Sequence, residues 1–174
     1  MAQPVVGIIM GSDSDLDIMS EAAKTLDEFG VANEVRVLSA HRTPDKTVEY
    51  IKGAKDRGLK IIIAGAGGSA HLAGVAAANT TLPVLSIPVK REGHDHEALF
   101  SNIAMPPGVP LAVMPENGGK NAALMAIEIL SLGDEDLAKK YSDFRQKQHD
   151  KVSEADNHVQ QSGWQEHLRK QGEK

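Results

Sequence analysis

The sequence predicts an α/β fold in which a parallel sheet is covered by helices on both faces. Short runs of apolar, β-branched residues recur along the chain, and most of them end at a glycine-rich or polar turn. Stretches with apolar residues at helical spacing follow these turns. Aromatic residues make up only 3 % of the 174 residues. The core must therefore consist of aliphatic side chains, which suits helices packed closely on a sheet.

Two strand–helix pairs open the chain. Residues 5–10 are apolar and end at Gly11, which predicts a buried strand, and apolar residues then recur at helical spacing until Gly30. A second strand is expected at residues 31–38, followed by a turn at 39–43. The next helix is expected to start at Pro44, because a helix accepts proline in its first turn.

Three further strands are expected at residues 60–64, 82–89 and 109–113. A helix of small residues ending near residue 78 follows the first of them, and a helix from about 118 to 132 follows the last. From residue 134 the composition becomes polar, with a helical stretch to about residue 161. We therefore expect an α/β catalytic domain over residues 1–133. A helical C-terminal extension over residues 134–174 is expected to pack on the domain or on a neighbouring subunit, and its end is a candidate for disorder.

Composition excludes several classes of function. The net charge is −5, and no dense run of Lys and Arg is present, which argues against nucleic-acid binding. The chain has no cysteine, so disulfides, thiolate metal sites and cysteine nucleophiles are excluded. No apolar stretch reaches the ~18 residues of a membrane span. We expect a cytoplasmic protein without membrane contact.

Four polar or glycine-rich segments follow predicted strands, at residues 11–15, 39–45, 65–72 and 88–96. In a parallel sheet the carboxyl ends of all strands lie at one edge, where ligands bind. These segments are therefore expected to line one pocket.

The first and third segments suit anionic ligands. Ser12 and its neighbours offer hydroxyl and backbone N–H groups at a helix N-terminus, which favours phosphate, although the same residues also cap helices. Gly65 and Gly67 partly match a dinucleotide fingerprint, but the expected acid ~20 residues later is missing. The glycines favour either a carboxylate or carbon dioxide close to the backbone, or simply close packing of a helix on the sheet.

His41 and His71 each follow a predicted strand at this edge. A single histidine is more often a surface or capping residue, but two on one rim favour proton transfer at neutral pH. Arg42 beside His41 suits phosphate. His94 and His96 form an HxH pair without further ligands, which favours solvated loop residues, so no metal site is expected.

Four segments together resemble the PurE family of 5-(carboxyamino)imidazole ribonucleotide mutases: MGSDSD at 10–15, SAHRTPD at 39–45, AGAGGSAHL at 64–72 and NAAL at 121–124. The resemblance implies a flavodoxin-like three-layer sandwich that assembles as a homo-octamer, a ribonucleotide substrate, and no cofactor. It implies that Ser12, Ser39 and Arg42 hold the phosphate, that Asp15 binds the ribose, and that His41 is the catalytic acid and base. The implied site comprises catalytic His41 and His71, with substrate-binding Gly11, Ser12, Asp13, Asp15, Ser39, Ala40, Arg42, Gly65, Ala66, Gly67, Gly68, Ser69 and Leu72.

The implied reaction moves a carboxylate from the exocyclic nitrogen to ring carbon 4 in purine (IMP) biosynthesis. Two alternatives stay open: a carboxylase that uses free carbon dioxide, and a binding module without turnover. The intact Ala40-His41-Arg42 favours the mutase. Ser69, Ala73 and the charged residues 90–97 depart from the usual pattern of the family and keep the alternatives open.

Overall fold

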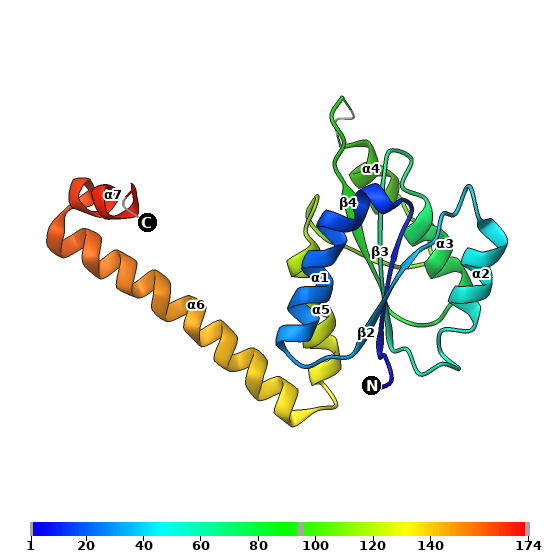
Figure 1. Ribbon diagram of the computed structural model, residues 1–174, viewed down its shortest axis with the longest axis horizontal. Helices are drawn as coiled ribbons and strands as arrows, with labels where there is room; N and C mark the ends of the chain where they lie inside the picture. The colour runs from blue at the N-terminus through cyan, green and yellow to red at the C-terminus, as the bar shows by residue number, and fades with distance from the viewer. Residues whose placement is uncertain (1, 94–95, 173–174) are drawn as a thin grey trace. The chain divides into compact units, whose positions relative to one another are not determined.

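Five parallel strands form one sheet in the order β2-β1-β3-β4-β5 (Figure 1). The strands are β1 Val6–Met10, β2 Asn33–Val37, β3 Ile61–Gly67, β4 Val84–Val89 and β5 Ala112–Val113. This computed structural model describes residues 2–93 and 96–172. The sheet confirms the expected α/β, flavodoxin-like fold, in which β1 lies between β2 and β3.

The register brings the carboxyl ends of the strands to one edge. Met10 pairs with Val37 on one side and with Gly65 on the other, and Gly67 pairs with Val89. The turns that follow β1 to β4 therefore start close together. This edge lies at the top of the sheet in Figure 1.

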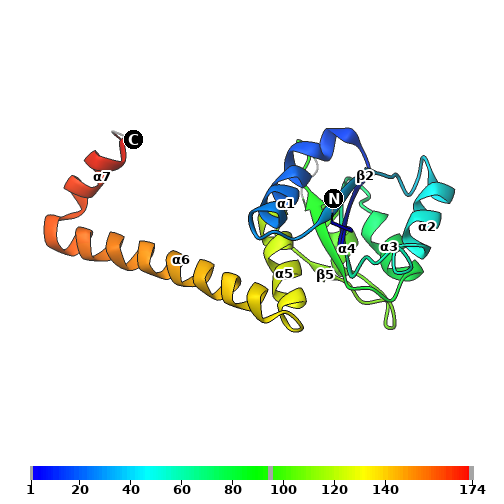
Figure 2. The ribbon, with the colours of Figure 1, turned by 60° about the horizontal axis from the view of Figure 1, so that its bottom comes forward.

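Helices cover both faces of the sheet, as Figures 1 and 2 show together. The helices α1 (Leu16–Glu28) and α5 (Gly119–Ser131) lie on one face. Gly119 faces the Ile18 carbonyl so closely that a Cβ would overlap it, which explains glycine at the start of α5. The helices α2 (Pro44–Lys52) and α3 (Leu72–Asn79) lie on the other face. There Ile51 and Leu72 share a buried core with Ile62 and Val84.

The short helix α4 (Glu97–Ile103) packs on the same face as α2 and α3. Val84 belongs to the core under α3, and Ser86 points to the same face because side chains alternate along a strand. The buried Ser86 hydroxyl donates to Asn102 Oδ1 of α4 at 2.8 Å. No helix was expected at these residues. Its N-cap, His96, has a left-handed backbone (φ 59°), and its side chain makes no capping hydrogen bond.

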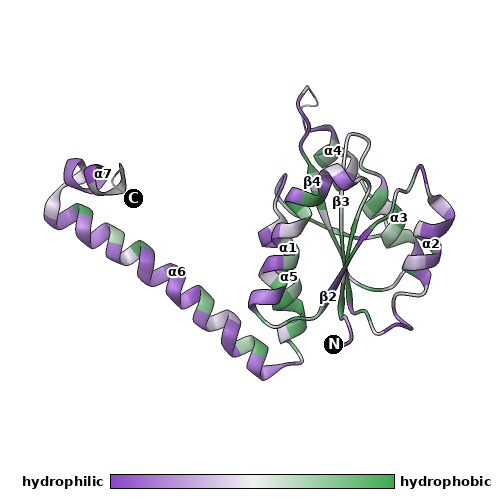
Figure 3. Ribbon diagram, viewed as in Figure 1, coloured by the Kyte–Doolittle hydropathy of each residue, from purple (hydrophilic) through white to green (hydrophobic). Residues whose placement is uncertain are grey.

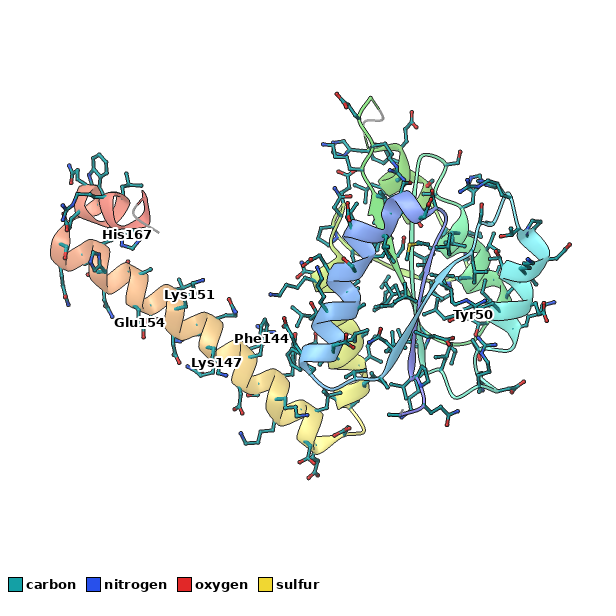
Figure 4. All side chains as sticks on the ribbon, viewed as in Figure 1. Tyr50, Phe144, Lys147, Lys151, Glu154 and His167 are labelled. Carbon is teal, nitrogen blue, oxygen red and sulfur yellow. The ribbon has the colours of Figure 1, made fainter. Side chains whose placement is uncertain are left out.

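The strands at the two edges differ from expectation. β5 has two residues instead of the five expected at 109–113. β2 was expected to be covered on both faces, but Val35 and Val37 are 38 % and 55 % exposed in this chain. On its covered side, Glu34 of β2 accepts a hydrogen bond from the Tyr50 hydroxyl at 2.8 Å. Figure 4 labels Tyr50 on α2. Tyr50 fits because Gly7 has no side chain: a Cβ there would lie 2.5 Å from the Tyr50 hydroxyl oxygen.

The chain divides into two units, Met1–Leu130 and Ser131–Lys174. The second unit contains α6 (Glu135–Ser162) and α7 (Trp164–Gly172), which Figure 3 shows as mostly hydrophilic. Asp134 caps α6 by accepting from the Leu137 N–H at 2.9 Å. Gly163, with φ 79°, ends it in a conformation that favours glycine. The helix α7 was not expected from the sequence.

Candidate active site

A cavity of about 240 Å³ lies at the carboxyl edge of the sheet. Its walls come from the turns after β1, β2, β3 and β4. The lining residues are Gly11, Ser12, Asp15, Ser39, Ala40, His41, Arg42, Ala66, Gly67, Ala70, His71, Leu72 and Arg91.

The turn after β1 places a buried carboxylate beside the hydroxyl groups of two serines. Ser12 and Asp15 form a capping box: the Ser12 hydroxyl accepts from the Ser14 N–H at 3.3 Å, and the Ser12 N–H donates to Asp15 Oδ2 at 3.2 Å. Asp15 is only 1 % exposed. Burial raises the pKa of Asp15 above its usual value, while Arg91, the Ser12 N–H and Arg42 act in the opposite direction.

The turn after β2 is tied to the turn after β1 by Arg42. The Arg42 N–H donates to Ser39 Oγ at 3.1 Å, and Arg42 Nη2 donates to the Gly11 carbonyl at 2.5 Å. The Thr43 hydroxyl accepts from the Ser39 N–H at 3.0 Å, which fixes the start of the turn. Arg42 is exposed, so its remaining N–H groups can meet an anion that enters the cavity.

His41 and His71 meet across the cavity although 30 positions separate them in the sequence. His41 Nε2 lies 2.9 Å from His71 Nδ1, and the two rings are nearly perpendicular, with an interplanar angle of 85°. One of these nitrogens must donate the proton and the other accept it. The contact therefore couples the orientation and tautomer of the two rings, and both side chains remain exposed to a ligand.

The end of β3 and the turn after it present mostly small residues to the cavity. Gly68 has φ 62°, and Ala70, although not a glycine, has φ 44°. Ala66 and Gly67, at the end of β3, line the cavity, as does Leu72, the first residue of α3. Backbone groups of this turn can thus approach a small ligand closely.

Four residues of the implied site do not line the cavity: Asp13, Gly65, Gly68 and Ser69. The Asp13 carboxylate instead accepts from the Ser14 N–H at 3.1 Å, as a local cap. Gly65 faces the interior, where a Cβ would overlap the sulfur of Met19 in α1. These two residues have clear structural tasks.

Arg91 and Ala70 line the cavity but were missing from the site inferred from the sequence. Arg91 Nη2 forms an ion pair with Asp15 and donates to Ser14 Oγ at 2.9 Å. The available signal was its position: it lies two residues after the carboxyl end of β4, in the last of the four segments. Residues 88–96 were expected to line the pocket, but none of them was assigned to the site.

No metal site emerges in the described ranges 2–93 and 96–172, where no three His, Cys, Asp or Glu side chains gather as ligands. His96 Nδ1 contacts Glu116 Oε2 at 2.8 Å, whereas His94 and Asp95 lie outside the described residues. Within the same ranges no helix has the length and apolar character needed to cross a bilayer.

The fold and the cavity define a class: a flavodoxin-like α/β protein with a polar pocket for a small anionic molecule at the carboxyl edge of its sheet. The chain belongs to the AIR carboxylase family, whose sequence pattern matches residues 5–151. This confirms the family resemblance inferred from the four motifs.

Relatives and a solved structure agree with this assignment. The N5-carboxyaminoimidazole ribonucleotide mutase of Thermotoga maritima is 46 % identical to this chain, and the alignment spans 95 % of this chain and 97 % of the relative. The phosphoribosylaminoimidazole carboxylase of Schizosaccharomyces pombe is 47 % identical over 92 % of this chain but only 29 % of its own. The crystal structure of Treponema denticola PurE is 31 % identical, with a TM-score of 0.83 over 90 % of this chain and 98 % of that one.

Proposed function

We propose that this chain is a 5-(carboxyamino)imidazole ribonucleotide mutase, an isomerase of purine (IMP) biosynthesis. It moves the carboxylate of its substrate from the exocyclic nitrogen to ring carbon 4. The contact between His41 and His71 carries the proposal, because it sets a proton donor and acceptor in a cavity that also contains Arg42. The Thermotoga maritima mutase, which aligns with 95 % of this chain, supports the same reaction.

The ribonucleotide has two anionic groups, and the cavity offers a place for each. The phosphate is assigned to Arg42 with Ser12 and Ser39, because a guanidinium and hydroxyl groups at a helix N-terminus are good phosphate ligands. The ribose is assigned to Asp15, whose carboxylate accepts hydrogen bonds from hydroxyl groups. The carboxylate is assigned to the backbone of the turn after β3, near Gly67.

The reaction needs one proton donated and one removed. His41 protonates the exocyclic nitrogen as the nitrogen–carbon bond breaks and carbon dioxide leaves. Ring carbon 4 then attacks the carbon dioxide, and His41 removes the proton from carbon 4. The His41 imidazole donates one proton and takes one back, so it ends the reaction in its starting state. His71 keeps the His41 imidazole oriented. Carbon dioxide must stay in place between the two steps, which a close backbone wall favours.

The deciding experiment supplies two substrates separately and follows the 4-carboxy product by absorbance. Product from the carboxyamino substrate alone is expected. Product only from aminoimidazole ribonucleotide with bicarbonate would show the carboxylase instead. The S. pombe relative, a phosphoribosylaminoimidazole carboxylase, is the reason to test this alternative. Ribonucleotide binding with no product from either mixture would show a binding module.

Replacement of His41 tests its role. We expect His41→Asn to lower kcat by at least about a hundredfold, because positioned acid–base groups contribute ~10²–10⁴-fold, while calorimetry still detects ribonucleotide binding. His149→Asn is the matched control, since His149 lies exposed on α6. Unchanged kcat in His41→Asn would refute the assignment.

The proposal includes assembly as a homo-octamer and a cytoplasmic location. The family resemblance supports the first, and the absence of cysteine suits a reducing compartment. Light scattering of the purified chain measures its mass directly. A mass of 18.6 kDa, that of one chain, would refute the octamer.

A further inference from the structure

Arg91 reaches the cavity from a segment that no family motif covers. It follows β4 and lies on the opposite side of β1 from Arg42, so the cavity holds two guanidinium groups from different turns. Arg91 Nη2 pairs with the Asp15 carboxylate and donates to Ser14 Oγ at 2.9 Å. Its side chain thus connects the turns after β4 and β1.

The Arg91 side chain occupies space that the absence of a side chain at Gly67 leaves open. A Cβ on Gly67 would lie 2.8 Å from Arg91 Nε and 3.0 Å from Arg91 Cγ. Arg91 therefore crosses the end of β3 at a position where only glycine leaves room. Because Gly67 also lines the cavity, the side chain passes directly beside the place assigned to the substrate carboxylate.

The segment that carries Arg91 is attached at both ends to the turn after β5. The Lys90 N–H donates to Asn117 Oδ1 at 2.9 Å, and His96 Nδ1 contacts Glu116 Oε2 at 2.8 Å. The Asn117 N–H in turn donates to the Pro88 carbonyl at 3.0 Å. These bonds hold the backbone on either side of Arg91.

Asp15 needs such a partner. It is 1 % exposed, and it lies three residues from Ser12, in the turn assigned to the phosphate. A buried carboxylate next to a dianionic phosphate is unfavourable unless cations offset both charges. The charged groups that act on Asp15 are Arg91 and Arg42, which favour its ionised form, and Asp13, which opposes it.

We propose that Arg91 is a positioning residue for substrate binding: it holds the ionised Asp15 carboxylate in place for the ribose hydroxyls. The inference rests on the proposed function, which supplies the ribonucleotide. Arg91 acts through Asp15, so its loss weakens binding and leaves the proton transfer at His41 intact. A direct role of Arg91 in the chemical step would instead change kcat.

The test is a double-mutant cycle with Arg91→Met and Asp15→Asn. Loss of one hydrogen-bonded charge partner is expected to raise KM about ten- to a hundredfold, with kcat within about threefold of the unmodified enzyme. In the Asp15→Asn background, Arg91→Met should have little further effect on KM. Arg91→Lys should restore part of the affinity because it keeps the charge. Lys90→Met is the matched control: it removes the adjacent, exposed charge, whose side chain is not among those lining the cavity.

The pH dependence of KM separates this role from a purely structural one. Without Arg91 the pKa of Asp15 rises further, so as the pH is lowered, KM of Arg91→Met should begin to increase at a higher pH than KM of the unmodified enzyme. An equal rise of KM in both Asp15 backgrounds, a parallel pH profile, or a loss confined to kcat would overturn the inference. Calorimetry with aminoimidazole ribonucleotide measures the same cycle without turnover. An inactive unmodified enzyme would therefore count against the proposed function alone.

Discussion

Gly65 provides a sharp test of where the site ends and the core begins. The family resemblance implies that it binds substrate, but the structure places it in the buried strand β3, facing α1. A Cβ at Gly65 would overlap Met19 Sδ and lie 2.9 Å from Met19 Cε, and Met19 has no exposed surface. We therefore expect Gly65→Ala to affect stability before binding.

The magnitude follows from the packing. Overfilling a tight core costs about 1–3 kcal/mol. For a chain of this size each kcal/mol lowers Tm by about 2–4 °C, so Tm should fall by about 2–12 °C. Thermal unfolding at one fixed protein concentration, followed by circular dichroism, measures the change. KM, determined well below the transition, should stay within about twofold of that of the unmodified enzyme, because a substrate contact would cost more.

Two further variants make the test specific. Gly133→Ala is the control, since Gly133 has no heavy atom within 4 Å of a built Cβ and no positive φ. In a Met19→Ala background the cost of Gly65→Ala should largely disappear, because the overlapping sulfur is gone. An unchanged Tm together with a raised KM would refute the packing argument and return Gly65 to the site.

Three more outcomes follow from the geometry. Arg42→Ala should raise KM at least about tenfold with kcat little changed, and an unchanged KM in steady-state kinetics would exclude its phosphate role. Because the pKa of Asp15 is raised, the ligand-free native state binds more protons than the unfolded state. Protonated Asp15 therefore contributes to the free energy of unfolding at low pH, and this contribution disappears as the pH rises through the native pKa. Urea unfolding measured across pH should show a smaller pH dependence in Asp15→Asn. Ser86→Ala should lower the free energy of unfolding by about 1–3 kcal/mol, because the buried Asn102 Oδ1 loses its donor, and an unaltered urea midpoint would contradict this.

The sequence predicted the sheet well because its signals are local. β1, β3 and β4 are apolar runs that end at glycine or proline-containing segments. β1, β4 and the first five residues of β3 are buried as expected. The helix α5 spans Gly119–Ser131, close to the expected 118–132. Strand order and the exposure of β2 depend on pairing between distant segments, which no local pattern encodes.

Two helices, α4 and α7, were not expected from the sequence. The helix α4 has seven residues and no side-chain cap, and the buried bond between Asn102 and Ser86 ties it to the sheet. The helix α7 follows Gly163 in a polar segment without a clear apolar period. A glycine in a polar stretch normally predicts the end of a helix and gives no sign of a second one.

The cavity also contains residues that were predicted from the sequence and residues that were not. His41, His71 and Arg42 were proposed for one rim from strand ends alone, and the structure brings them together. Arg91 lies in a segment that was also expected at this rim, but it was not singled out, because an arginine between a lysine and a glutamate has the pattern of a solvated surface. Only its path across Gly67 to Asp15 distinguishes it.

The position of β1 between β2 and β3 also has a kinetic consequence. Each parallel pairing joins segments far apart in the chain, such as Val6 with Ile61, so closing the sheet requires long loops to form first. The cavity is lined by residues from Gly11 to Arg91, so it is complete only once the chain has been made and folded at least as far as Arg91. Ligand can therefore stabilise the finished domain but cannot guide its early folding, whose rate is set by non-local contacts.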